Sequence, residues 1–122
     1  MIYLYGLAHP ETATDAVDLA ELPGVTGPVT LSPTRFGTLI HGPAPEGDIL
    51  PKRRFLLAHT KVLEAFNALG TVLPMRFGMS APDPAALEAM LAQSPEAVAA
   101  SFARLDGAIE LGLRVRFDRT RA

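Results

Sequence analysis

Residues 71–78 read Thr71-Val72-Leu73-Pro74-Met75-Arg76-Phe77-Gly78, a strand-like apolar run that contains a proline and an arginine. Proline removes a donor from the backbone ladder, so it is normally confined to edge strands, bulges or strand starts. An arginine in an apolar run needs a carboxylate partner or a route to water. We therefore expect an edge or a bulge at Pro74, and a carboxylate partner for Arg76.

A second strand-like segment supplies such a carboxylate. From Ile109 to Asp118, apolar and polar residues alternate with a period of two, which is typical of a strand with one buried face. If this strand lies beside residues 71–78, Glu110 and Arg76 project from the same face and can form a directional pair. We expect this pair to fix the register of the two strands.

Three helices are expected, and their ends are marked by proline in the first helical turn and by glycine after the last turn. They span about residues 51–69, 84–92 and 95–105. The first has an apolar stripe at helical spacing, and the other two begin with an N-cap residue followed by proline. Gly107 is expected to close the last helix.

The first half of the chain is expected to supply the remaining strands. One strand covers about residues 2–7, and a hairpin joins residues 28–31 to residues 36–41. Residues 11–22 are either a short helix or a loop. This element order predicts an α+β sandwich, in which a mostly antiparallel sheet carries helices on one face. A ferredoxin-like arrangement is the nearest common architecture.

Length and composition limit the classes of function. The chain of 122 residues fits one domain, and it contains no apolar run near the roughly 20 residues needed to span a bilayer. It has no cysteine, which excludes a disulfide framework and thiolate chemistry. A net charge of −2 gives no overall bias toward nucleic acid. We expect a cytoplasmic protein that needs no cofactor or metal ion.

Few residues are candidates for chemistry. The sequence has no glycine-rich phosphate loop, no nucleophile elbow and no histidine pair with metal-ligand spacing. His59 falls in register with the apolar stripe of its helix, so we expect a neutral histidine bonded to the backbone or to a carboxylate. An acid–base role opposite Glu110 or Arg76 is the alternative.

Basic residues are candidates for a contact surface. Lys52, Arg53 and Arg54 fall in the first turn of a predicted helix, where cations oppose the helix dipole, so helix stability does not explain them. They form a solvated cluster, an electrostatic handle for an acidic partner or, as the least favoured alternative, a contact to nucleic acid. Arg114 and Arg116 lie on the polar side of the last predicted strand, where they would protect a sheet edge or contact a partner.

Four segments occur in a fixed order that is typical of a known family. They are Tyr3-Leu4-Tyr5-Gly6, His59-Thr60-Lys61-Val62-Leu63, the run at residues 71–78, and residues 105–115. Together they resemble the N-terminal domain of the gas vesicle accessory proteins of the GvpL/GvpF type, nearly end to end. The resemblance implies a modified ferredoxin-like domain and a non-enzymatic role in gas vesicle formation. It also implies that the partners are the small hydrophobic shell protein and other accessory proteins.

Typical members of that family continue into a second α/β domain after the segment that matches residues 114–118, whereas this chain ends at Ala122. We therefore expect residues 1–122 to form a single domain of the N-terminal type. Two other hypotheses stay open. One is a ferredoxin-like ligand-binding or regulatory domain that acts as a dimer through its sheet edges. The other is an enzyme that uses His59 with Arg76 and Glu110.

Overall fold

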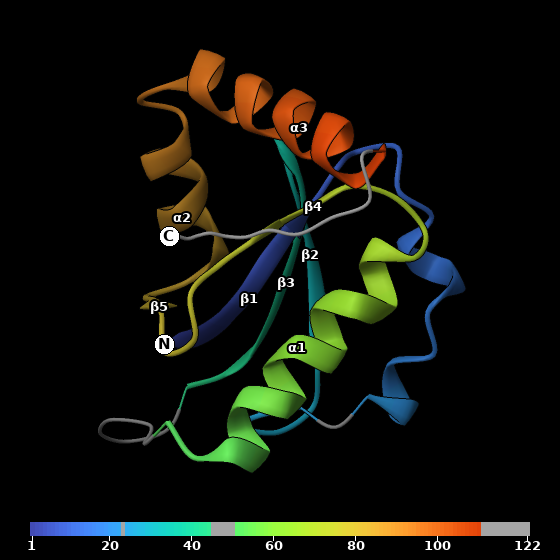
Figure 1. Cartoon of the computed structure of the whole chain (residues 1–122). Helices are drawn as coiled ribbons and strands as arrows, with labels where there is room; N and C mark the ends of the chain where they lie inside the picture. The colour runs from blue at the N-terminus through green and yellow to red at the C-terminus, as the bar shows by residue number, and fades with distance from the viewer. Residues whose placement is uncertain (23, 45–50, 111–122) are drawn as a thin grey trace.

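The computed structural model describes residues 1–22, 24–44 and 51–110, with only the backbone described for residues 105–110. Within this part of the chain, antiparallel strands form one sheet in the order β2-β3-β1-β4, and β5 pairs with the start of β1 (Figure 1). The strands are β1 (Ile2–Ala8), β2 (Thr30–Thr34), β3 (Gly37–Pro43), β4 (Val72–Pro74) and β5 (Ser80–Ala81). The helices are α1 (Arg53–Asn67), α2 (Pro84–Leu91) and α3 (Pro95–Glu110), with the short 3₁₀ helices η1 (Thr14–Ala16) and η2 (Leu19–Glu21) between β1 and β2.

The central strand β1 is buried on both faces. Tyr3 and Tyr5 belong to one group of buried side chains and Leu4 to another, as the alternation of a strand requires. The register with β3 shifts between Leu4 and Gly6, so one extra residue bulges out of β1. Because of this bulge, Leu7 shares the face of Leu4 instead of the face of Tyr5.

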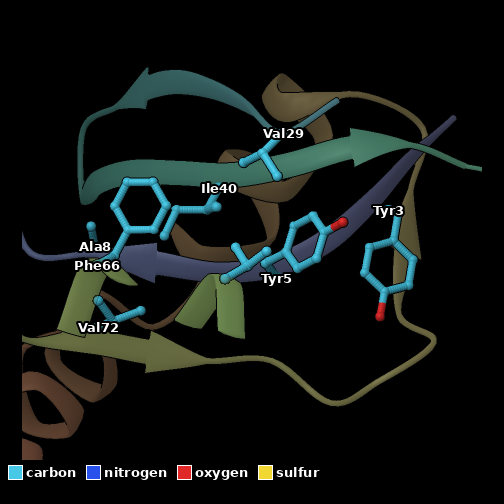
Figure 2. Close-up of a cluster of buried hydrophobic side chains, with 8 residues drawn as sticks. Tyr3, Tyr5, Ala8, Val29, Ile40, Phe66 and Val72 are labelled. Carbon is cyan, nitrogen blue, oxygen red and sulfur yellow. The ribbon is translucent and has the colours of Figure 1, made fainter. Parts of the chain in front are cut away.

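The two faces of the sheet therefore carry separate cores. In the first core, α1 packs through Val62 and Phe66 against Tyr5 and the neighbouring strands. Figure 2 shows Phe66 and Tyr5 beside Ile40 of β3. The second core lies on the opposite face, where α2 contributes Leu87 and α3 contributes Phe102. The buried members of the first core are Tyr3, Tyr5, Ala8, Val29, Ile40, Val62, Phe66 and Val72. Those of the second core are Leu4, Leu7, Leu39, Ala81, Leu87, Val98 and Phe102.

This arrangement confirms the α+β class but corrects the expected layering. The prediction that the helices lie on one face is wrong, because α1 covers one face of the sheet and α2 with α3 cover the other. A strand buried on both faces reads as a nearly continuous apolar run, and residues 2–8 are such a run. A ferredoxin-like order places a helix between the first two strands. In the described part of this chain, η1 and η2 stand there instead.

The run at residues 71–78 forms a strand only over β4, which lies at the edge of the described sheet. The predicted edge position of Pro74 is therefore confirmed. Pro74 pairs with Gly6 of β1, and the next residue, Met75, donates its backbone N–H to the Tyr5 carbonyl oxygen at 3.0 Å. The pairing with β1 thus continues past the proline, because the proline lacks a donor only at its own position.

The other predicted elements differ from the structure mainly at their ends. The hairpin of β2 and β3, the helix α1 and the helix α2 are all present close to the expected residues. α3 does not stop at Gly107 but runs to Glu110, so the predicted strand start at Ile109 is wrong. One glycine inside a helix costs only about 1 kcal/mol, which the remaining turns of a long helix can offset. Residues 111–118 of that predicted strand lie outside the described residues.

The close approach of β1 and β4 predicts that Gly6 does not tolerate a side chain. A Cβ atom at Gly6 would lie 2.7 Å from the Leu73 carbonyl oxygen and 2.9 Å from Leu63 Cδ2. Since backbone atoms cannot move aside cheaply, Gly6→Ala should lower the free energy of unfolding by about 1–3 kcal/mol. Urea denaturation monitored by circular dichroism measures this change.

Gly78→Ala is the matched control for Gly6→Ala. No atom lies within 4 Å of a Cβ built at Gly78, and its φ of +92° strains any other residue. Gly78→Ala should therefore lower the free energy of unfolding only through backbone strain, by about 1 kcal/mol. A Gly6→Ala protein as stable as the wild type would contradict the close contact between the two strands.

Candidate functional site

A chain of hydrogen bonds inside the first core joins β1, α1 and the segment that follows β4. The Tyr3 hydroxyl lies 2.7 Å from His59 Nδ1, and His59 Nε2 lies 2.8 Å from the Met75 carbonyl oxygen. A carbonyl oxygen can only accept, so His59 carries its proton on Nε2 and accepts the Tyr3 hydroxyl proton at Nδ1. The Gly78 N–H donates to the same hydroxyl at 3.4 Å. The Tyr3 hydroxyl and both ring nitrogens of His59 thus have hydrogen-bond partners.

Aromatic rings enclose the His59 imidazole. Tyr5 stacks on it with ring centroids 5.4 Å apart, while Tyr3 and Phe77 approach edge-on at 5.7 and 5.9 Å. Burial lowers the pKa of His59, and the bond to the Met75 carbonyl offsets only part of this effect. Burial also raises the pKa of the Tyr3 hydroxyl to about 12. Both groups are therefore neutral at neutral pH.

This geometry confirms the predicted neutral histidine bonded to the backbone. Both ring nitrogens of His59 hold structural partners, and Arg76 is exposed in the turn that follows β4. The other histidines lie elsewhere: His41 Nε2 lies 2.8 Å from Ser32 Oγ on β2, and His9 Nδ1 accepts the Glu11 backbone N–H at 3.1 Å. Among the described residues, no three side chains are placed to hold a metal ion.

The predicted pair of Arg76 and Glu110 has a different structural setting from the one expected. Glu110 is the last residue of α3 and not a strand residue, so the pair cannot fix the register of two strands. The Glu110 side chain lies outside the described residues, and an ion pair between the two residues stays a prediction.

The basic residues Lys52, Arg53 and Arg54 lie at the start of α1 and are exposed. Lys52 occupies the N-cap position without a capping side-chain bond, and the first turn contains no acidic residue. The Arg54 guanidinium lies 4.8 Å from the centroid of the Phe55 ring. Within residues 1–22, 24–44 and 51–104, no acidic side chain pairs with these cations. Arg114 and Arg116, the other predicted contact residues, lie outside the described residues.

Sequence reasoning missed the apolar part of this surface. Leu56 and Leu57 are 41% and 48% exposed, next to the cluster of cations. Leu57 lies on the side of α1 opposite the buried residues His59, Val62 and Phe66. The signal was present in the sequence, because helical spacing places residue 57 away from the apolar stripe.

A groove of about 410 Å³ lies on the other side of the molecule, between the β2–β3 turn and α3. The Arg35 guanidinium lies 4.9 Å from the Phe36 ring centroid, and the His9 ring meets the Phe102 ring edge-on at 5.0 Å. Its lining residues are His9, Pro10, Arg35, Phe36, Pro95, Val98, Ala99, Phe102 and Ala103. The volume falls in the range of small-molecule sites.

Comparison with known proteins assigns the family. Over residues 1–122 the chain matches the family described as gas vesicle synthesis protein GvpL/GvpF. The chain belongs to this family. Gas vesicle protein F of Streptomyces sp. (strain CB03234) is 35% identical over 126 residues, which cover 95% of this chain and 48% of that relative. The chain thus spans about half the length of this GvpL/GvpF relative, and no solved structure matches it.

Family membership gives the chain a gas vesicle-related role and confirms the resemblance seen in its ordered segments. None of the helices in the described ranges has the length and apolar character needed to cross a membrane.

The buried histidines predict a loss of stability in acid. Burial lowers the pKa of both His59 and His41 below the ordinary value of 6.5, so below that pH the unfolded chain binds more protons than the folded chain. The free energy of unfolding should be independent of these histidines' titration above pH 6.5. Below that pH it should fall, by at most about 1.4 kcal/mol per pH unit for each histidine. Urea denaturation at several pH values between about 5 and 7.5 measures this slope.

His59→Gln separates the two histidines, because a glutamine amide can still donate to the Met75 carbonyl but does not titrate. The variant should lose the His59 share of the slope and keep the His41 share. The same slope in variant and wild type would show that His59 is not held in its neutral form.

The cations at the start of α1 predict a stabilising substitution. Arg53→Glu removes a positive charge from the positive end of the helix dipole and places a carboxylate there. It should raise the free energy of unfolding by about 0.5–1 kcal/mol. Arg104→Glu on the exposed side of α3 makes the same charge change away from this position, and it should change stability by less than about 0.5 kcal/mol. If Arg53→Glu destabilised the chain in urea denaturation, Arg53 would have a structural partner that the described residues do not include.

Proposed function

We propose that this chain is a gas vesicle assembly protein that binds the hydrophobic shell protein and other accessory proteins. The observation that carries the proposal is the match to the GvpL/GvpF family over residues 1–122. In this proposal the chain acts without catalysis and is associated with gas vesicles in the cytoplasm. Residues 1–122 work as one domain of a modified ferredoxin-like type.

The arrangement of the described site supports a binding role over a catalytic one. His59 and Tyr3 satisfy each other inside the first core, so their bonding capacity is used for structure. The charged side chains at the start of α1 are exposed and have no ion-pair partner in the described part of the chain. Groups of this second kind are available to another protein, and they steer its approach through their field.

We assign the contact surface to the basic residues of the chain. Lys52, Arg53 and Arg54 form its described part, and Arg114 and Arg116 are proposed to extend it. A shell subunit that is very hydrophobic would aggregate if left alone in water. A protein that binds the shell subunit until it is built into the vesicle wall would prevent this aggregation. Such a protein needs a folded domain with an accessible surface.

Capture of the shell protein tests this function. The chain carries an affinity tag and is co-expressed with the shell protein of a gas vesicle gene cluster, and the co-purified material is quantified by mass spectrometry. The wild-type chain should retain the shell protein. Reversal of Lys52, Arg53 and Arg54 to glutamate should reduce the retained amount at least about fivefold, which corresponds to about 1 kcal/mol.

Arg104→Glu is a single charge reversal outside this surface, and its capture should equal that of the wild type. The single variant Arg53→Glu, which makes the same change of charge within the surface, should retain less. The full-length Streptomyces gas vesicle protein F is the positive control for the assay. If the relative retained the shell protein under conditions in which this chain did not, the proposed function would be wrong.

A further inference from the structure

The exposed face of α1 combines an apolar residue with a ring of cations. On a helix surface, residue 57 has its closest neighbours at positions 53, 54, 60 and 61. For Leu57 these neighbours are Arg53, Arg54, Thr60 and Lys61, so three of the four are cations. All of these side chains are exposed, and Leu57 itself is 48% exposed. A leucine half in water is thus enclosed by positive charge.

The cations on this face do not serve the stability of the fold. Arg53 and Arg54 oppose the dipole of their own helix, and the first turn contains no acid to offset them. No side chain in the described part of the chain forms an ion pair with Arg53, Arg54 or Lys61. Leu57 adds nothing to either core, since it belongs to neither group of packed side chains.

We propose that this face of α1 binds an acidic amphipathic helix of a partner protein. The face consists of Arg53, Arg54, Leu56, Leu57 and Lys61, and we call it the α1 face. Leu57 is the apolar anchor, and the cations pair with carboxylates on either side of the partner's apolar stripe. From Arg53 to Lys61 the α1 face is about 12 Å long, which matches about two turns of a partner helix. This inference rests on the proposed function, because it names the kind of partner segment that the surface accepts.

The charge pattern of the chain disfavours a second copy as the occupant. Its exposed acids are most concentrated around η1 and η2, where Glu11, Asp15, Asp18 and Glu21 lie. The apolar residues of that segment, among them Leu19 and Leu22, already pack against the first core. This acidic segment of a second copy could therefore offer charge to the α1 face but no free apolar stripe for Leu57.

Nucleic acid is also a poor occupant. Single strands bind to proteins through aromatic side chains on which bases stack, beside basic residues. Tyr3 and Tyr5 are buried in the first core, and the Phe55 ring beside the α1 face is partly buried and lies 4.8 Å from the Arg54 guanidinium. The net charge of the chain is −2, which does not favour a polyanion.

A designed peptide tests the α1 face directly. The probe is a fluorescein-labelled 18-residue helical peptide with leucines at helical spacing and glutamates on both sides of them. A matched peptide carries lysines in place of the glutamates. Fluorescence anisotropy should show binding of the acidic peptide and no binding of the basic one. A rise in salt from 50 to 300 mM should weaken the binding severalfold, because the contacts are charged and lie near the surface.

Two pairs of variants assign the binding to the α1 face. Leu57→Ser should weaken binding of the acidic peptide at least tenfold, whereas Leu69→Ser, an equally exposed leucine beyond the other end of α1, should leave it unchanged. Lys61→Glu should weaken binding severalfold, whereas Arg104→Glu on α3 should not. All four positions lie outside the buried cores, so circular dichroism should show four folded proteins.

Several results would overturn the inference. They are equal binding of both peptides, and acidic-peptide binding that survives Leu57→Ser. Self-association in sedimentation that Leu57→Ser abolishes would make a second copy the occupant. If the chain bound no peptide but co-sedimented with phosphatidylserine vesicles, and Leu57→Ser abolished this co-sedimentation, the occupant of the α1 face would be a lipid surface.

The outcome also separates this inference from the proposed function. If the chain captures the shell protein but fails to bind the acidic peptide, the assignment of the α1 face is wrong and the function stands. If it binds the peptide through Leu57 but captures no gas vesicle protein, the α1 face stands and the proposed function is wrong.

Discussion

The hydrogen bonds from Tyr3 to His59 and from His59 to the Met75 carbonyl connect the parts of this molecule that the chain itself separates. Tyr3 lies on the central strand, His59 on α1, and Met75 just beyond the edge strand β4. An unbonded polar group at this depth would cost about 1–3 kcal/mol. This cost favours the arrangement of the three elements that pairs these atoms, and burial keeps the imidazole neutral in that position.

This packing determines which surfaces remain free. One side of α1 packs against the first core through His59, Val62 and Phe66, and the other side exposes Leu57 and its neighbouring cations to water. On the other face of the sheet, α2 and α3 close the second core. The uncharged polar network is therefore buried, and the unpaired charges among the described residues lie on the surface.

Much of the fold could be predicted because its signals are local. Helical spacing located α1, the N-cap residues and prolines located α2 and α3, and Pro74 indicated the edge of the sheet. The helix end predicted at Gly107 was wrong, because a glycine allows a helix to end but does not require it. The histidine's neutral state and its backbone bond followed from its place in the apolar stripe. The Tyr3 partner did not, since 56 residues separate the two side chains.

The sequence by itself determined most of the helices and strands, the family and the direction in which each helix turns its apolar side. Each of these depends on spacing within one segment or on the order of segments along the chain. Only the tertiary structure decided how the side chains of β1 divide between the two cores, because one bulge near Gly6 exchanges the faces of all later residues of β1. It also decided that Leu57 stays exposed, since exposure depends on what the rest of the chain leaves uncovered.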